Sequence, residues 1–362
     1  MAFELVRKKT SPIGIDLGSR RVKMVQLRLG GDDAELLAAG AAEVQLDGVK
    51  GCQERTALLL QAVRGILRSN PVKGRHCILS LPAQETFVHH VKLPRLSPQQ
   101  TQEALRMELG SKLPYPVEEA VIQHIVAGEV CAEGEARREV IVVAAPRATL
   151  EAYLAMARRA KLDVVGVNIE ACAIVECFSR MFRRAEDSAR TILFVDLGAA
   201  STQVVLSHGG HIVFARNLTS AGQQLDHAVA DGMSISIEQA GARRRELQQA
   251  SSPGRAEDEL YRLLDRPLNA LADEVTQCLR YYESVFRNQP IERVIFLGGQ
   301  AHDKRLCQGL AQRLNLPAQV GDPLSLVKRV AGAATEIGID RRQPQPDWAV
   351  AIGLCLGTGM AA

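Results

Sequence analysis

The sequence lacks the patterns that mark several common protein classes. Its eight cysteines include no CxxC pair and no spacing that brings two of them to a pair of histidines, which excludes a zinc-binding pattern and favours reduced thiols. No apolar run reaches the roughly 18 to 20 residues that span a bilayer. The opening MAFELVRKKT carries charge where a secretion signal needs its apolar stretch. The sequence therefore predicts a protein that stays in the cytoplasm.

Two common nucleotide-binding motifs are also absent. No Gly-Lys-Ser/Thr follows a glycine at P-loop spacing, and no strand leads into GxGxxG. The formal net charge of +3 is small for 362 residues, and the basic residues are spread along the chain. Composition thus gives no case for nucleic-acid binding, although it leaves a local basic surface open. The length fits two domains of about 150 residues each.

The chain contains two matched hairpin patterns, IGIDLGSRRVKMVQL at 13–27 and LFVDLGAASTQVVLS at 193–207, whose aspartates lie 180 positions apart. A strand that ends in Asp and a glycine turn presents backbone N–H groups to phosphate oxygens. Its carboxylate can hold Mg²⁺ through water. The pair, Asp16 and Asp196, predicts a phosphate clamp. The alternative is two structural hairpins of a duplicated fold that has lost its ligand.

A third glycine-rich element occurs late in the chain. The strand pattern at Val294–Leu297 runs into Gly298 and Gly299 before a helix from about Lys304. Two glycines at the end of a strand allow a base or a phosphate to approach the backbone. We also expect the positive end of the following helix dipole to contribute there.

The hydrophobic spacing predicts the remaining organisation. A helix is expected from Glu54 to Arg68, a strand–helix–strand–strand–helix segment at 84–163, and a long helical region with a loop at 251–255. The apolar closing stretch is expected to be a packed helix.

The order of the expected helices and strands resembles that of the actin, sugar kinase and heat-shock chaperone superfamily. In its motifs the sequence resembles in detail the FtsA-related PilM family of type IV pilus assembly proteins. The resemblance rests on DLGSRRVKMV, DLGAASTQVV, LGGQA, the closing DWAVAIGLCLG and, most specifically, LPAQETFVHHVKLPRLSPQQTQEALRMELGSKLPYPVEEAVIQ. It covers essentially the whole chain. It implies an α/β fold of duplicated actin-like, ribonuclease H-like domains, with a β-α-β-β-α subdomain inserted in the first half.

The resemblance also implies domain boundaries. The first subdomain comprises 1–83, completed by 164–190 and the C-terminal helix 345–362. The inserted subdomain is 84–163, and the second domain is 191–344 with a mainly helical part at about 216–290.

ATP and Mg²⁺ are the ligands that the resemblance implies, with Asp16 and Asp196 holding the metal through water. The implied nucleotide contacts are Asp16, Gly18, Ser19, Lys23, Asp196, Gly198, Ser201, Thr202, Arg244, Gly298, Gly299 and Gln300. Where relatives tend to have GGGS or GGSS, this chain has Gln300 and Ala301 after the two glycines, which removes a glycine and a hydroxyl. It also has Gly241 where a ribose-contacting acid is usual and Arg244 where a lysine is usual. These departures predict reduced nucleotide affinity.

The family docks an N-terminal cytoplasmic peptide of its inner-membrane partner PilN near the inserted subdomain. The corresponding groove residues here are Leu113, Pro114, Tyr115 and Pro116. These residues can also have a purely structural role, because the two prolines force an extended corner and Tyr115 can pack that corner against the sheet. The resemblance further implies pilus motor or alignment proteins as partners, self-association, no nucleic acid, and membrane contact only through the partner.

Catalysis is the least defined expectation. A sugar kinase needs an Asp base between the two phosphate motifs, but the segment VVGVNIEACA offers only Asn168 and Glu170. Glu170 is a candidate for orienting water in slow hydrolysis, although a Glu at a helix start also serves the dipole. We therefore expect a nucleotide-dependent scaffold with at most weak ATPase activity. The alternatives are an FtsA-like filament-forming division protein, whose relatives end in a basic membrane helix not seen here, and a small-molecule kinase.

Overall fold

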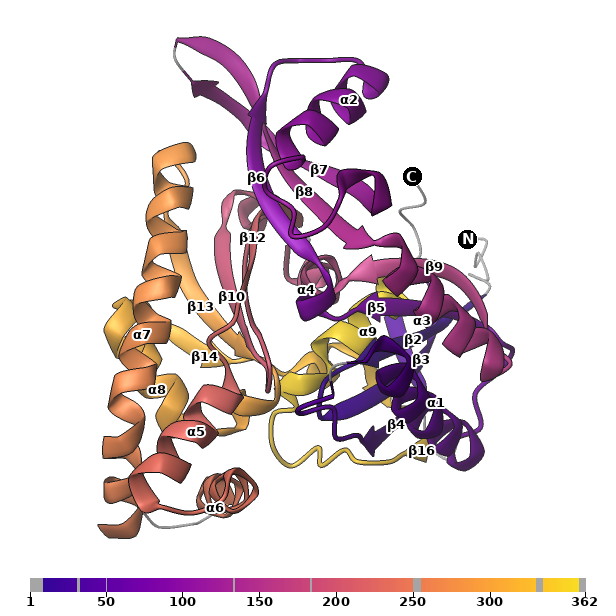
Figure 1. Cartoon of the computed structure of the whole chain (residues 1–362), viewed down its shortest axis with the longest axis vertical. Helices are drawn as coiled ribbons and strands as arrows, with labels where there is room; N and C mark the ends of the chain where they lie inside the picture. The colour runs from indigo at the N-terminus through magenta and orange to yellow at the C-terminus, as the bar shows by residue number, and fades with distance from the viewer. Residues whose placement is uncertain are drawn as a thin grey trace, which may run out of the picture.

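The computed structural model describes residues 9–30, 33–49, 51–132, 134–182, 184–249, 255–329 and 335–357. Two halves, each built on a β-sheet, lie side by side, and a third, smaller sheet stands over their junction (Figure 1). The expected loop residues 251–254 and the chain end 358–362 lie outside the described residues.

The first half is built on a mixed sheet with the central order β4-β3-β2-β5-β9, to which β1, β15 and β16 add at β3 and β4. The strands are β1 Lys9–Thr10, β2 Ile13–Leu17, β3 Arg21–Gly30, β4 Asp33–Glu43, β5 His76–Leu81, β9 Asp163–Ile169, β15 Lys328–Arg329 and β16 Thr335–Glu336. All of β2 is buried, because sheet neighbours flank it on both sides and helices cover it.

The second sheet repeats this plan in the order β12-β11-β10-β13-β14. Its strands are β10 Thr191–Leu197, β11 Thr202–His208, β12 His211–Leu218, β13 Ile291–Leu297 and β14 Ala318–Val320. In both sheets the first Asp-bearing strand pairs antiparallel with the next strand of the chain and parallel with a later one. The matching pairing supports duplication of one domain.

Nine helices of the described chain surround the sheets: α1 Cys52–Ser69, α2 Pro98–Leu109, α3 Arg147–Arg159, α4 Glu170–Phe178, α5 Gly222–Met233, α6 Ile237–Gln249, α7 Arg255–Val285, α8 Lys304–Leu314 and α9 Ala349–Leu356. The spacing of Leu59, Val63 and Ile66 buries one face of α1, as expected. The helix ends at Ser69 because Asn70 is extended, as a residue before proline must be.

The third sheet has the order β6-β8-β7, from β6 Phe87–Leu93, β7 Ala120–Ala132 and β8 Glu135–Pro146. Helix α2 packs on it and begins with a capping box between Ser97 and Gln100, with Pro98 at the first helical position. Leu105 and Leu109 of α2 join Val140 and Val142 of β8 in a separate small core. The element order expected for 84–163 is therefore present, while the division of the chain into domains stays a prediction.

Helices α4 and α9 pack against each other between the two large sheets. They approach so closely that a Cβ on Gly353 would lie 1.8 Å from the carbonyl oxygen of Ala173. Similarly, a Cβ on Gly14 would lie 2.3 Å from the carbonyl oxygen of Ala351. Both helices belong to a core that includes residues of both halves. This tightly packed pair joins the halves and positions the cavity between them.

Candidate functional site

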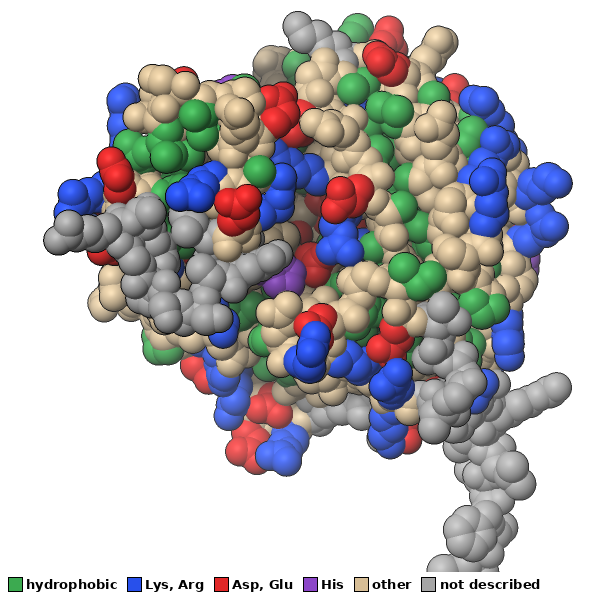
Figure 2. All heavy atoms as spheres, turned by 90° about the horizontal axis from the view of Figure 1, so that it is seen from below, with side chains coloured by type: hydrophobic (Ala, Val, Ile, Leu, Met, Phe, Trp, Pro, Cys, Tyr) green, Lys and Arg blue, Asp and Glu red, His purple; other side chains and the backbone are tan. Residues whose placement is uncertain are grey.

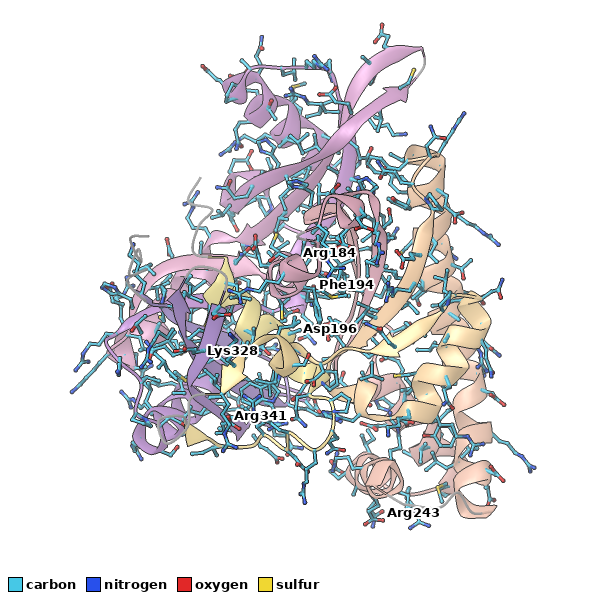
Figure 3. All side chains as sticks on the ribbon, turned by 180° about the vertical axis from the view of Figure 1, so that it is seen from behind. Arg184, Phe194, Asp196, Arg243, Lys328 and Arg341 are labelled. Atoms are coloured by element: carbon cyan, nitrogen blue, oxygen red, sulfur yellow. The ribbon has the colours of Figure 1, made fainter. Side chains whose placement is uncertain are left out.

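A cavity of about 1230 Å³ lies between the two halves, and the ends of both predicted hairpins line it. Figure 2 looks onto the hollow between the halves, where acidic and basic side chains gather. The Asp196 end of β10 points toward the junction of the halves (Figure 3). The cavity is large enough for a nucleotide-sized ligand.

The two hairpins have the same local geometry. Asp16 lies opposite Lys23 across β2 and β3, and Asp196 lies opposite Gln203 across β10 and β11. A Cβ on Gly18 or on Gly198 would lie 2.6 Å from a backbone carbonyl of its own turn. Each hairpin therefore needs its glycine for the same steric reason.

In the first hairpin the aspartate is paired with a cation. The Nζ atom of Lys23 lies 3.0 Å from the Oδ2 atom of Asp16 and 3.9 Å from Asp347, which precedes α9. Burial lowers the pKa of Lys23, but the charges of Asp16 and Asp347 outweigh it and raise the pKa. Lys23 is thus a fixed positive charge in the cavity wall.

Asp347 also contacts Arg21 and His302 at the same wall. Arg21 donates to its Oδ2 atom at 3.0 Å, and His302 lies 3.4 Å from Oδ1. Burial raises the pKa of Asp347, but the His302 hydrogen bond and the charges of Lys23 and Arg21 outweigh it and hold the pKa at about 2. Asp347 stays ionised and neutralises part of the basic cluster.

In the second hairpin the aspartate has no hydrogen-bond partner among the described residues. Burial and repulsion by Asp16 raise the pKa of Asp196 to about 7, against the charge of Lys23. Gly298 lies beside it with φ +83°, and a Cβ there would be 2.3 Å from an Asp196 carboxylate oxygen. Asp196 thus makes no ion pair among the described residues, and its burial favours either protonation or a bound cation.

Glu170, the first residue of α4, lines the cavity next to these aspartates. Burial raises its pKa well above the usual value, and the charges of Asp16 and Asp196 raise it further. The side-chain amide of Gln203 donates to it. Three carboxylates therefore face one region in which Lys23 is the counter-charge that acts on all three.

The glycine-rich element closes the cavity beside the second hairpin, with Gly298, Gly299 and Gln300 in its wall. The expected helix begins at Lys304 as α8, and the contribution of its dipole at the glycines stays a prediction. A 3₁₀ turn at Gly299–His302 separates the glycines from α8, and the buried Asp303 caps α8 by accepting from the backbone N–H of Leu306 at 2.9 Å. The Asp303 side chain thus satisfies one of the free N–H groups at the start of α8.

Two residues that depart from the family pattern contact each other. Arg244 is 3% exposed and donates through Nη2 to the Oε1 atom of Gln300 at 2.6 Å. Its Nη1 atom donates to Asp226 at 2.6 Å and to the carbonyl of Gly222 at 3.1 Å. The guanidinium therefore fixes three elements of the second half around the cavity.

Polar contacts bridge the two halves at the cavity mouth. Arg20 of the first half donates to Asp226 of the second at 2.7 Å and contacts Asp47 at 3.2 Å. Gln223 of the second half donates to Asp47 at 2.6 Å. Closure of the cavity is thus coupled to a small network of charged and amide groups.

The structure brings most of the predicted site residues together. Those that line the cavity are Asp16, Gly18, Ser19, Lys23, Glu170, Asp196, Gly198, Ser201, Arg244, Gly298, Gly299 and Gln300. Thr202 is not brought into it, because neighbours on a strand alternate and Gln203 takes the side that faces the cavity. Thr202 is fully buried instead.

The four predicted partner-groove residues lie away from the cavity. Leu113 and Tyr115 pack against the small core of the third sheet, while Pro114 and Pro116 are exposed. Burial raises the pKa of Tyr115. The structural reading of this corner agrees with the packing, and the peptide-binding role stays a prediction.

Sequence reasoning missed several polar residues of the cavity wall, including Arg20, Arg21, Asp47, Gln223, Asp226, Glu238, His302 and Asp347. Asp347 carried a signal, since it stands in the closing DWAVAIGLCLG. Arg20 and Arg21 stand in DLGSRRVKMV, but the motif did not show what they contact. The contacts of all these residues depend on how distant parts of the chain meet.

The residues present fit a polyphosphate with a hydrated cation. Glycine turns on both sides leave backbone room for phosphate oxygens. Three neighbouring carboxylates would repel an anion unless a cation lay between them. Among the described residues, no cluster of three or more His, Cys, Asp or Glu is placed to hold a metal ion directly.

Comparison with known proteins gives a family match. The family model described as "Type IV pilus assembly protein PilM" matches residues 14–358. A solved PilM-PilN type IV pilus biogenesis complex is similar to this chain at 23% identity and a TM-score of 0.78, covering 96% of this chain and 98% of that one.

Two more distant structures share the architecture. The ethanolamine utilization protein EutJ from Carboxydothermus hydrogenoformans matches with a TM-score of 0.55 at 12% identity, over 96% of this chain and 89% of its own. A glycerol dehydratase reactivase matches with a TM-score of 0.50 at 12% identity, over 96% and 100%. These matches confirm the expected actin-like α/β fold class. No helix in the described residues combines the length and apolarity that a membrane span requires.

Proposed function

The chain belongs to the PilM family of type IV pilus assembly proteins, and from that premise we propose that it is a cytoplasmic scaffold whose halves close on Mg²⁺-ATP. The observation that carries this proposal is the pair of equivalent hairpins facing one cavity, with Asp16 and Asp196 close enough for one to raise the pKa of the other. Burying two carboxylates that repel each other costs stability, so this arrangement is not expected in hairpins that serve only the fold.

Different residues of the cavity would bind the phosphates and the cation. The turns at Gly18 and Gly198 offer backbone N–H groups to phosphates, and Lys23 supplies positive charge beside them. Asp196 and Asp16 would hold water molecules of the cation. When bound, Mg²⁺ would add positive charge to that of Lys23 beside the three carboxylates.

At the adenosine end of the proposed nucleotide site, another residue can replace the ribose-contacting acid that is usual at position 241. Glu238 lies one helical turn before Gly241 on α6, and both line the cavity. We propose that Glu238 accepts from the ribose. The Arg244–Gln300 contact provides a flat polar wall for the base.

Nucleotide binding would act on the bridge at the mouth. Closure brings Arg20 and Asp47 of the first half onto Asp226 and Gln223 of the second. A ligand that binds the closed arrangement better than the open one shifts the population toward it. Because the third sheet also contacts β12 of the second half, closure would change how that sheet is presented.

The partner in this proposal is the N-terminal cytoplasmic peptide of a PilN-like inner-membrane protein, since the similar solved complex contains PilN. The corner at 113–116 borders its proposed groove. Pilus motor or alignment proteins and further copies of the chain are additional proposed partners. The protein would lie at the inner membrane through this peptide.

Titration with a fluorescent ATP analogue tests the nucleotide site. We expect saturable binding that requires Mg²⁺ and is lost in Asp16→Ala and in Asp196→Ala. Asp231→Ala, an exposed aspartate on α5 that does not line the cavity, is the matched control and should bind like the parent. Saturable binding that both cavity variants retain would refute the site.

Fluorescence anisotropy with the labelled N-terminal peptide tests the partner site. We expect Pro114→Ala, which changes an exposed side chain of the corner, to weaken peptide binding. The control is Gln99→Ala, an exposed position on α2. Equal peptide affinity in the parent and Pro114→Ala would place the groove elsewhere.

A further inference from the structure

A group of seven basic side chains gathers where the ends of α1 and α3 meet. These side chains, which we call the α1/α3 basic surface, are all exposed: Arg64, Arg68, Lys73, Arg75, Arg158, Arg159 and Lys161. None of them lines the nucleotide cavity. Sequence composition could not reveal this surface, because its members come from two segments about 90 residues apart.

Hydrogen bonds fix the two segments side by side. Arg64 of α1 donates to the carbonyl oxygen of Arg159 at 2.7 Å. Arg75 donates to the carbonyl oxygen of Lys161 at 2.9 Å, and its own carbonyl accepts from Asp163 at 2.9 Å. The basic surface is therefore continuous across the last turns of both helices.

This surface is not neutralised locally. None of the seven side chains has a carboxylate within ion-pair distance among the residues that the structure describes. The carboxylate of Asp163 beside them pairs with His76 at 3.2 Å. In Figure 2, Lys and Arg side chains gather along the right-hand edge, on the side where Figure 1 places α1 and α3.

Helix stability accounts for only part of this charge. Basic side chains at the end of a helix interact favourably with its dipole, and Arg64 and Arg75 also satisfy carbonyls near the end of α3. The other five have no hydrogen bond from their side chains in the described chain. Five exposed, unpaired cations on one outer edge exceed what capping two helices requires.

We propose that the α1/α3 basic surface binds the surface of an anionic bilayer directly. The surface lies on the outer edge of the molecule, so a flat membrane can reach all of it at once (Figures 1 and 2). It contains no aromatic side chain for stacking bases, which disfavours single-stranded nucleic acid. Juxtaposed Lys and Arg residues each add to the attraction to anionic lipids, in a salt-dependent way. The surface would orient the protein at the membrane while the partner peptide tethers it.

Vesicle co-sedimentation of the full chain without partner peptide tests this proposal. We expect binding to phosphatidylcholine vesicles that contain phosphatidylglycerol, weaker binding as salt rises, and none to phosphatidylcholine alone. Arg68→Glu/Arg158→Glu should weaken binding at least about tenfold, because four units of charge change on one face. The control Arg262→Glu/Arg280→Glu changes net charge equally at exposed α7 positions and should bind like the parent.

Three results would overturn the proposal: no binding to anionic vesicles, equal loss in both double variants, or binding to neutral vesicles as well. If the protein bound a DNA duplex but no vesicles, and Arg68→Glu/Arg158→Glu weakened the DNA binding, the α1/α3 basic surface would be a nucleic-acid site instead. Lys73→Gln/Arg159→Gln adds no carboxylate, so it provides the same comparison if the first variant fails to fold. Failure here would leave nucleotide and peptide binding untouched, because those assays contain no lipid.

Discussion

The equivalent aspartates of the two hairpins should respond in opposite ways to the same substitution. Asp196 has a pKa of about 7 because it is buried and faces Asp16. In an unfolded chain its pKa is near the ordinary aspartate value of 3.8. The folded protein therefore binds more protons than the unfolded one between these values, and stability falls as pH rises through that window.

The magnitude follows from the size of the shift. About three pH units at 1.36 kcal/mol each set an upper bound of roughly 4 kcal/mol above pH 7, and solvent in the cavity reduces it to about 2 to 4 kcal/mol. Asp196→Asn removes the charge. In the nucleotide-free protein at pH 8 we therefore expect the variant to be more stable than the parent by about that amount.

Asp16→Asn provides the contrast. It removes the 3.0 Å partner of Lys23, which is 8% exposed. Breaking a buried pair costs about 3 to 5 kcal/mol, and the more distant Asp347 offsets part of the loss. We expect Asp16→Asn to lower the free energy of unfolding by about 2 to 3 kcal/mol.

Urea denaturation of the parent and both variants at several pH values between 5 and 8 measures these effects. The parent should lose stability with rising pH, and Asp196→Asn should have a slope smaller by up to about 1.36 kcal/mol per pH unit, which corresponds to one proton. Saturating Mg²⁺-ATP should then favour the parent, since it alone keeps both carboxylates. Destabilisation by Asp196→Asn at pH 8, or an unchanged slope, would refute the electrostatic reasoning.

Three further outcomes are expected. Gly298→Ala should lower the free energy of unfolding by about 1 to 3 kcal/mol in thermal unfolding, because φ is +83° and the added Cβ would lie 2.3 Å from a carboxylate oxygen of Asp196. The control Gly299→Ala has open space around its Cβ and should change the free energy of unfolding by less than about 0.5 kcal/mol. Tyr281→Phe should cost about 1.5 to 3 kcal/mol in urea denaturation, since its hydroxyl donates at 2.7 Å to the buried Glu139 of the third sheet, and an unchanged midpoint would contradict this. Glu170→Gln should keep nucleotide affinity and abolish any slow phosphate release measured with a coupled assay, and unchanged release would exclude Glu170 as the water-orienting group.

The sequence was informative wherever a short local pattern had a steric cause. Each Asp-Leu-Gly hairpin requires a glycine because a Cβ would meet a carbonyl of its own turn. The motif can therefore be recognised in the sequence. Helix α1 likewise followed from the local spacing of its apolar residues. The sequence also placed the start of α8 at about Lys304, but it did not show the 3₁₀ turn at Gly299–His302 or the buried Asp303 cap.

By itself, the sequence determined that two equivalent hairpins exist and that each ends in an aspartate. Only the tertiary structure decided that Asp16 is neutralised and Asp196 is not, because that depends on Lys23 opposite one and Gln203 opposite the other, on burial, and on Asp347, which comes from the far end of the chain. The Arg244–Gln300 contact was decided in the same way. Desolvation and charge pairing act between residues that the fold brings together, whereas turn sterics act between neighbours along the chain.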